Sequence, residues 1–133
     1  MNRICIVVDK TMSAGHKANV AAILTGQLAK DVPKLYETSV NDKSDVIHTG
    51  IAANVIVLDG GREQLLTLIN NIKNSEVKYS VFSSIGQSLS NDYTEYRYQI
   101  SAMDTRTTCV IGVGIAGEDS TVRFHTKKFS LMK

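Results

Sequence analysis

The sequence has little of what disulfide frameworks, metal sites and membrane spans require. Its 133 residues include two cysteines, three histidines, one proline and no tryptophan. Cys5 and Cys109 both fall in apolar runs, where free cysteine behaves as a small buried hydrophobe. A metal site needs several cysteines or histidines at close spacing, which this chain does not offer. We therefore expect two reduced thiols, no metal and no cofactor.

Charge of one sign and long apolar runs are scarce as well. The formal net charge is +2, which is too small to indicate nucleic-acid binding by itself. The first apolar run covers only residues 4–8, whereas a signal-peptide core needs about seven to fifteen residues and a membrane helix about eighteen. We expect no membrane association, a cytoplasmic location and one domain spanning residues 1–133.

What the sequence does contain is a regular alternation of two apolar patterns. Apolar, β-branched runs predict strands at residues 3–9, 54–59, 78–84 and 107–116. Apolar residues at helical spacing predict helices over residues 14–32, 62–75, 91–103 and 118–127. This order predicts an α/β fold, a three-layer α/β/α sandwich with a mixed four-stranded sheet. We expect residues 34–53 to be irregular and the apolar tail FSLM to dock on the body.

One glycine-rich segment is spelled like a dinucleotide-binding motif. GVGIAG, residues 112–117, matches G-x-G-x-x-G. A dinucleotide site needs this motif at the first strand-to-helix turn, with a further strand and an acidic residue about 20 positions on. The segment stands at the last predicted strand, so we expect its glycines only to let a neighbouring helix or backbone approach closely.

The turn after the first predicted strand is the strongest candidate for a binding site. If Ser13 caps the following helix, the free N–H groups of residues 14–16 carry partial positive charge. Lys17 and His16 add to that charge, and ligands of open α/β sheets sit beyond the carboxyl ends of strands. The pattern predicts either an anion-binding corner or simply a solvated helix start.

Two further segments carry reactive side chains without a complete motif. Ser84 ends the third predicted strand and Ser88 follows it, and both could bind a ligand, act as nucleophiles or merely form turns and caps. His48 lies in a stretch with two aspartates, DKSDVIHTG, that lacks the spacing of a zinc or calcium site. A lone histidine of this kind is either functional or a surface residue.

Three segments together resemble the type-2 peptidyl-tRNA hydrolases. They are IVVDKTMSAGHKANVAAIL, REQLLTLINNIKNSEVKYSVFSSIGQS and TCVIGVGIAGEDSTVRFHTKKFSLM. A closer similarity is to an uncharacterised bacterial family with the same fold. It rests on NVAAIL, on Asp42…His48-x-Gly50-Ile51, on YTEYRYQIS and on the lysine-rich end.

The resemblance carries the hydrolases' site over only in part. It implies that Lys17 matches their turn lysine and that Ser88 lies near their threonine. It also implies that Ser84 stands where they have an aspartate and Ala21 where they have a glutamine. The carboxylate is the obvious group for orienting water, so we expect peptidyl-tRNA hydrolysis to be weak or absent.

Three functions remain open. The first is binding of a small anionic or nucleotide-like ligand at the strand ends, by Lys10, His16, Lys17, Asn19, His48, Ser84, Gly86 and Ser88. The second is a hydrolase, acting on peptidyl-tRNA or another ester, in which Lys17 and Ser84 or Ser88 work with His16 or His48 as base; an RNA end would then be a partner. The third is an interaction module, a homodimer built on Tyr93 and Tyr96.

Overall fold

A five-stranded mixed sheet forms the centre of the protein. The computed structural model describes residues 2–50 and 53–133, and Ile51 of the family resemblance lies outside them. The strand order is β5-β6-β1-β4-β7. The central strand β1 (Asn2–Asp9) is parallel to β4 (Asn54–Gly60) and antiparallel to β6 (Val110–Glu118). The edges are β5 (Lys78–Ser83) and β7 (Ser130–Leu131), both antiparallel to their neighbours.

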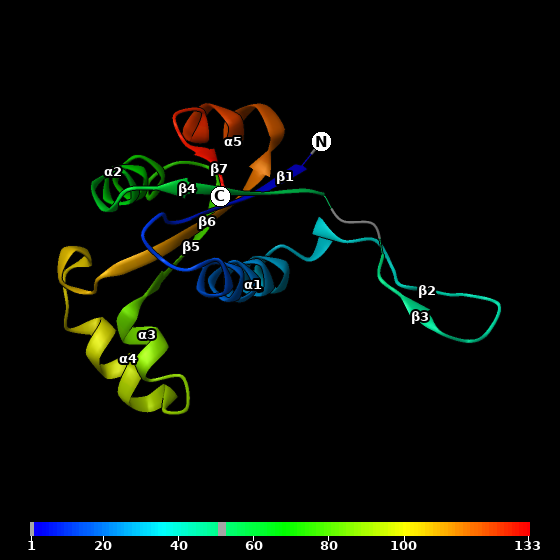
Figure 1. Cartoon of the computed structure of the whole chain (residues 1–133), viewed down its shortest axis with the longest axis horizontal. Helices are drawn as coiled ribbons and strands as arrows, with labels where there is room; N and C mark the ends of the chain where they lie inside the picture. Colours follow the sequence, from blue (N-terminus) through cyan, green and yellow to red (C-terminus); the bar gives the residue numbers. More distant parts are fainter. Residues whose placement is uncertain (1, 51–52) are drawn as a thin grey trace.

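Helices cover both faces of this sheet. The long helix α1 (Ala14–Asp31) packs on one face, and α2 (Arg62–Ile72) and α5 (Asp119–Thr126) pack on the other (Figure 1). β1 is apolar from residue 4 to residue 8 because successive side chains point to opposite, covered faces of the sheet. Cys5 and Val7 join the core under α2 and α5, whereas Ile4, Ile6 and Val8 join the core under α1.

The sheet has five strands, whereas the sequence predicted four. The sequence predicted that the FSLM tail would dock on the body. In the structure this tail forms a strand that pairs with the edge of β4, where Leu131 lies opposite Leu58 and Ser130 opposite Asp59. A strand of two residues is too short to show a period-2 pattern, so the sequence could indicate docking but not pairing. The consequence is functional, because this pairing brings the end of the chain to the end of β4.

The glycines of GVGIAG have the packing role expected of them. A Cβ added at Gly112 would lie 2.6 Å from Val20 Cγ1, and one at Gly114 would lie 3.0 Å from both Ile6 Cδ1 and Leu28 Cδ1. The absence of side chains at these two positions lets α1 lie directly on β6. The contact sets the position of the first turn of α1 relative to the strand ends.

The segment between β5 and β6 contains more structure than expected. Its helices are α3 (Ser84–Ser88), α4 (Tyr93–Ser101) and a 3-10 turn η2 (Thr105–Thr107). The sequence predicted α4 but placed only a turn at α3, since five residues with serine and glycine have no helical periodicity. The strand β6 begins at Val110, later than expected, because Cys109 adopts a left-handed backbone with φ 58°.

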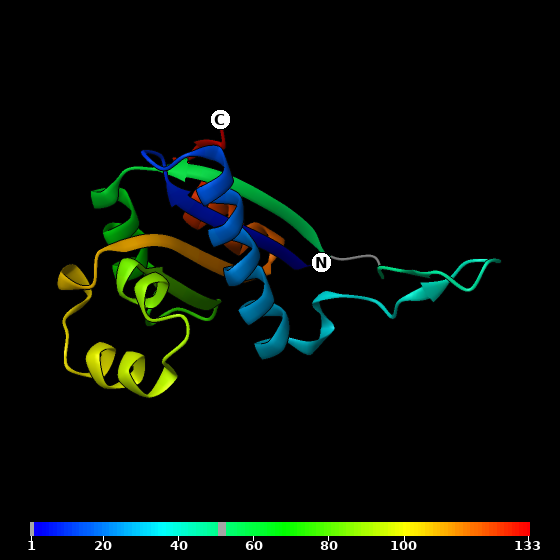
Figure 2. The ribbon, with the colours of Figure 1, turned by 60° about the horizontal axis from the view of Figure 1, so that its bottom comes forward.

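Residues 36–50 form an arm that extends away from the sheet (Figure 2). It follows the 3-10 turn η1 (Pro33–Leu35) and contains a hairpin of β2 (Val40–Asn41) and β3 (Ile47–His48). The legs of the arm touch backbone to backbone, because a Cβ on Gly50 would overlap the carbonyl group of Glu37. The loop expected over residues 34–53 therefore includes an ordered hairpin. In the described part of the chain, no helix has the length and apolar character needed to cross a membrane.

Candidate functional site

A buried ion pair between Lys17 and Asp59 lies at the carboxyl ends of the two parallel strands. Lys17 Nζ is 2.9 Å from Asp59 Oδ1, and the side chains are only 5% and 10% exposed. Asp59 belongs to β4, and Lys17 lies in the first turns of α1, the helix after β1. Because β1 and β4 run parallel, the end of β4 and the start of α1 meet at one edge of the sheet.

Local structure at the start of α1 explains why Lys17 points inward. Ser13 is the N-cap, and its side chain accepts a hydrogen bond from the backbone N–H of His16 at 3.2 Å. Lys17 N donates to Ser13 O at 2.9 Å, so the first turn is closed. The buried positions Lys17, Val20, Ala21 and Leu24 then share the face that packs on the sheet. Lys17 is therefore an interior residue rather than the free cation expected at a helix start.

The chain end completes the surroundings of this pair. Lys17 Nζ donates to the Lys133 carbonyl oxygen at 3.4 Å, and Lys133 N donates to Asp59 Oδ2 at 3.1 Å. Burial raises the pKa of the Asp59 carboxyl, but the hydrogen bond and charge of Lys17 and the contacts of Lys133 outweigh it. The net pKa of Asp59 is lowered from its usual value, so the carboxylate is ionised.

A basic hollow of about 570 Å³ opens beside the pair. We call it the basic hollow, and its lining residues are Lys10, Lys17, Asp59, Gln64, Lys128, Ser130 and Lys133. Four lysines thus surround one aspartate, which is already engaged by Lys17. Within the described residues, Lys10, Lys128 and Lys133 form no ion pair with an acidic side chain. The hollow has an excess of positive charge that suits an anion.

Gln64 and Lys10 lie at the start of α2, on the wall of the hollow. Gly61 is the N-cap of this helix, and Gln64 Oε1 accepts a hydrogen bond from Gly61 N at 2.8 Å. A Cβ on Gly61 would lie 4.0 Å from Lys10 Nζ, so the lysine extends over this turn. The amide of Gln64 is fixed by its cap bond, and its Nε2 group, which has no hydrogen-bond partner among residues 2–50 and 53–133, can donate to a ligand.

The histidines expected in the site lie elsewhere. His16 Nε2 is 2.5 Å from the side-chain amide nitrogen of Gln87, so it ties α1 to α3. His48 lies on the arm, 2.7 Å from Asp42 Oδ2, and both side chains are exposed. Neither histidine lines the basic hollow. The structure therefore brings neither histidine to Lys17, and the acid–base group beside Lys17 is the Asp59 carboxylate.

The other predicted residues have local partners. Ser84 N donates to Cys109 O at 2.9 Å, and Ser88 Oγ donates to Ile85 O at 3.1 Å. In residues 2–50 and 53–133, neither serine hydroxyl bonds a histidine. Asn19 is exposed on α1. Gly86 serves packing, because a Cβ there would lie 2.9 Å from Phe82 Cε1 and 3.2 Å from Tyr96 Cε1. Of the predicted set, only Lys10 and Lys17 come together in one hollow.

Sequence reasoning missed the residues from β4, α2 and the tail. Asp59 could have been found, since NVIVLD ends in aspartate as RICIVVD does and parallel strands end at one edge. Lys128, Ser130 and Lys133 could not, since their position depends on the pairing of β7. No three Cys, His, Asp or Glu side chains of the described chain are grouped to hold a metal ion.

The fold and the hollow define an α/β protein with a basic site at the carboxyl ends of its parallel strands. The chain belongs to the family described as "Protein of unknown function (DUF2000)", whose model matches residues 2–133. The closer of the two expected resemblances, to a family of unknown function, agrees with this finding. The link to the type-2 peptidyl-tRNA hydrolases is not shown by it and stays a prediction.

Among solved structures, the chain is similar to a protein of unknown function, Atu0240, from Agrobacterium tumefaciens strain C58. The two share 16% sequence identity and superpose with a TM-score of 0.86 over 99% of this chain and 98% of that chain. At this identity the likeness concerns the fold alone. A comparison with curated proteins finds no match.

Proposed function

We propose that this protein binds a small anionic ligand, through a phosphate or carboxylate group, in the basic hollow. The observation that carries the proposal is the gathering of Lys10, Lys128 and Lys133 around the buried Lys17–Asp59 pair. Asp59 neutralises Lys17, whereas the side-chain ammonium groups of the other three lysines form no ion pair with an acidic side chain in the described chain. An anion in the hollow would supply the missing charge.

The buried Lys17–Asp59 pair gives the basic hollow a rigid inner wall. A lysine and an aspartate that are both nearly inaccessible to water hold a single geometry, because separating them would leave unpaired buried charges. The lysines at the rim are exposed, so each contributes modestly to binding. We expect a dissociation constant in the millimolar to micromolar range, which corresponds to about 4–8 kcal/mol.

Hydrolysis is not part of the proposal. The hydrolase alternative assigned the base to His16 or His48, which are engaged by Gln87 and Asp42. The carboxylate that does lie beside Lys17, that of Asp59, is buried and held by Lys17 in an ion pair. The rim lysines and the Gln64 amide can bind and orient an anion without chemical reaction. Ligand binding is therefore the function that the arrangement of side chains supports best.

Titration with inorganic phosphate tests this proposal. Calorimetry and melting temperature should show binding that weakens with added sodium chloride, because exposed charges are screened. Lys10→Ala and Lys128→Ala should each weaken binding several-fold. Lys43→Ala, which removes an exposed lysine from the arm, is the matched control and should leave binding unchanged. Absence of a phosphate effect, or an equal effect of Lys43→Ala, contradicts the proposal.

A second candidate function is self-association through the arm. Val40, Val46 and Ile47 are 62%, 55% and 70% exposed there, although an isolated two-stranded hairpin is marginal in water. Tyr93, one of the two tyrosines expected in a dimer interface, is exposed too, whereas Tyr96 turns toward Gly86. Sedimentation velocity tests the idea: the double variant Val40→Ser/Ile47→Ser should be monomeric if the arm joins two copies. A wild-type protein that is monomeric at high concentration excludes it.

A further inference from the structure

A second depression adjoins the basic hollow, between α2 and α5. It has a volume of about 580 Å³, within the usual range of small-molecule sites, and we call it the aromatic groove. Leu68, Asn71, Phe124, His125 and Phe129 line it. Gln64 and Lys128 line both the groove and the hollow, so the two depressions are adjacent.

Phe124 is an exposed aromatic residue that lines this groove. Its side chain is 64% exposed although it stands on a helix that packs on the sheet. Lys127 Nζ lies 4.9 Å from the centre of the ring, and His125 meets the ring edge-on at a centroid distance of 5.3 Å. Because Lys127 lies over one face of the ring, a flat ligand would stack on the other face.

Phe129 forms the inner part of the groove, next to the strand end. A Cβ on Gly60 would lie 2.8 Å from Phe129 Cε1, so the glycine makes room for this ring at the end of β4. Gly60 directly follows Asp59, the acidic member of the buried pair. The apolar part of the groove is thus adjacent to the charged inner wall of the hollow.

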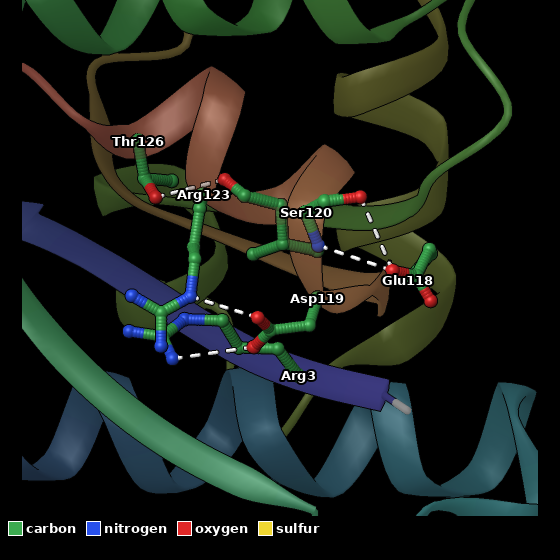
Figure 3. Close-up of polar contacts among 7 residues, drawn as sticks. Arg3, Glu118, Asp119, Ser120, Arg123 and Thr126 are labelled. Carbon is green, nitrogen blue, oxygen red and sulfur yellow. Dashed lines mark hydrogen bonds and ion pairs between the residues drawn. The ribbon is translucent and has the colours of Figure 1, made fainter.

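The helix that presents Phe124 is firmly attached to the sheet. Asp119, near the start of α5, accepts from Arg123 Nε at 2.8 Å and from Arg3 of β1 at 3.4 Å. Figure 3 shows both guanidinium groups turned toward this carboxylate, with Ser120 bonded to Glu118 beside it. This network fixes α5 relative to β1, so the position of Phe124 is set by the fold.

We infer that the ligand of the basic hollow is a mononucleotide-like phosphate ester whose flat ring occupies the aromatic groove. The phosphate would contact Lys10, Lys128 and Lys133, and the ring would stack on Phe124. The Gln64 and Asn71 amides can hydrogen-bond the polar edges of such a ring. This inference rests on the proposed function, because it assumes that the hollow holds the phosphate.

The groove carries one acidic side chain, and its charge is compensated. Glu63 lines the groove and lies 3.1 Å from Arg106. Lys127 and Lys128 lie at the same rim, so the surroundings remain favourable for a phosphate ester. A neutral aromatic ligand without phosphate would occupy the groove alone and would not contact the lysines of the basic hollow.

Four probes separate the two parts of the site: inorganic phosphate, ribose 5-phosphate, adenosine and AMP, each measured by calorimetry. We expect AMP to bind at least about tenfold more tightly than ribose 5-phosphate, and adenosine to bind weakly. Phe124→Ala should abolish the tenfold gain and leave binding of ribose 5-phosphate unchanged. Tyr98→Ala is the matched control, since it removes an exposed aromatic side chain from α4.

The outcomes distinguish this inference from the proposed function. If phosphate and ribose 5-phosphate bind but AMP binds no better, the inference is overturned and anion binding stands. If none of the phosphates binds, both fail. If Phe124→Ala weakens the binding of ribose 5-phosphate as much as the binding of AMP, the Phe124 ring only supports the structure of the basic hollow. That result overturns the inference. A short single-stranded RNA that binds far more tightly than AMP and uses the same lysines would replace the mononucleotide by an RNA end.

Discussion

Lys17 and Asp59 come from different layers of the fold and meet 2.9 Å apart, with hardly any water access to either side chain. One stands on the helix that covers the sheet and the other at the end of a strand. Such a pair need not stabilise the protein relative to apolar residues, but breaking it leaves a buried charge without a partner. The pair therefore couples the position of α1 to the inner wall of the basic hollow.

Loss of either partner should be costly. We expect Lys17→Met and Asp59→Asn each to lower the free energy of unfolding by about 3–5 kcal/mol, measured by urea denaturation. The double variant Lys17→Met/Asp59→Leu should recover much of that loss, because no charge is left unpaired. Arg106→Ala is the control: its pair with Glu63 is exposed on both sides, so the loss should be about 0–1 kcal/mol. Equal costs for buried and exposed pairs would refute this view.

Acid should destabilise the protein through Asp59. Its pKa is lowered in the folded state, so its contribution is present above the unfolded pKa of about 4 and is lost as the pH falls through the folded value. The free energy of unfolding of the wild type should therefore fall between about pH 5 and pH 2, and that of Asp59→Asn should fall less steeply. Asp42 and Asp119 also have lowered pKa values, but they are present in both proteins, so their contributions to the pH dependence cancel in the comparison. If the free energies of unfolding of the two proteins fall in parallel with pH, Asp59 does not contribute to the acid sensitivity of the fold.

Two glycine-to-alanine substitutions should change the free energy of unfolding in opposite directions. Gly112→Ala places a methyl group 2.6 Å from Val20 Cγ1 and 3.0 Å from Leu24 Cδ1, so we expect a loss of about 1–3 kcal/mol. Gly26→Ala adds a methyl group where no atom lies within 4 Å, on the exposed side of α1, and should gain about 0.5–1 kcal/mol. Thermal unfolding measures both. A neutral Gly112→Ala would mean that α1 can shift away from β6 at little cost.

The two cysteines should differ in reactivity. Cys5 is 1% exposed, and burial raises the pKa of its thiol to about 11, with Thr126 and Arg3 opposing the shift. Cys109 is only partly buried and lies directly before β6. Alkylation of the native protein at about pH 8 should modify Cys109 first, and Cys109→Ser should remove the fast phase. Both thiols should react in denaturant without reductant, and fewer than two would indicate a disulfide.

The sequence predicted the parts of the fold whose signals are local. The run from Ile4 to Val8 is apolar at every position, which is typical of a strand covered on both faces, and each of these side chains is buried. Helical spacing likewise predicted α1 and α2. The arm was predicted only as an irregular stretch rich in residues that form turns, among them Asp42, which accepts hydrogen bonds from the backbone of Ser44 and Val46.

The site was less predictable, because it depends on distant pairings. Lys17 was identified as a cation, but its burial depends on Asp59, which lies far along the chain and on another element. Lys128 and Lys133 enter the hollow only because two residues of the tail add to β4. His16 and His48 are plausible bases by residue type, yet their partners Gln87 and Asp42 hold them apart. Residue type indicates which chemistry is possible, and the tertiary contacts determine where the groups meet.

The short strand β7 has a consequence for motion. Two residue pairs, together with the bond from Met132 N to Val57 O, hold it to the sheet. So small a unit opens far more readily than the centre of the sheet, and its amide hydrogens should exchange with solvent early. An anion that bridges Lys128 and Lys133 to Lys10 would also tie this strand to the loop after β1. Occupancy of the hollow would then be visible as slower hydrogen exchange at the end of the chain, while exchange in β1 and β6 stays the same.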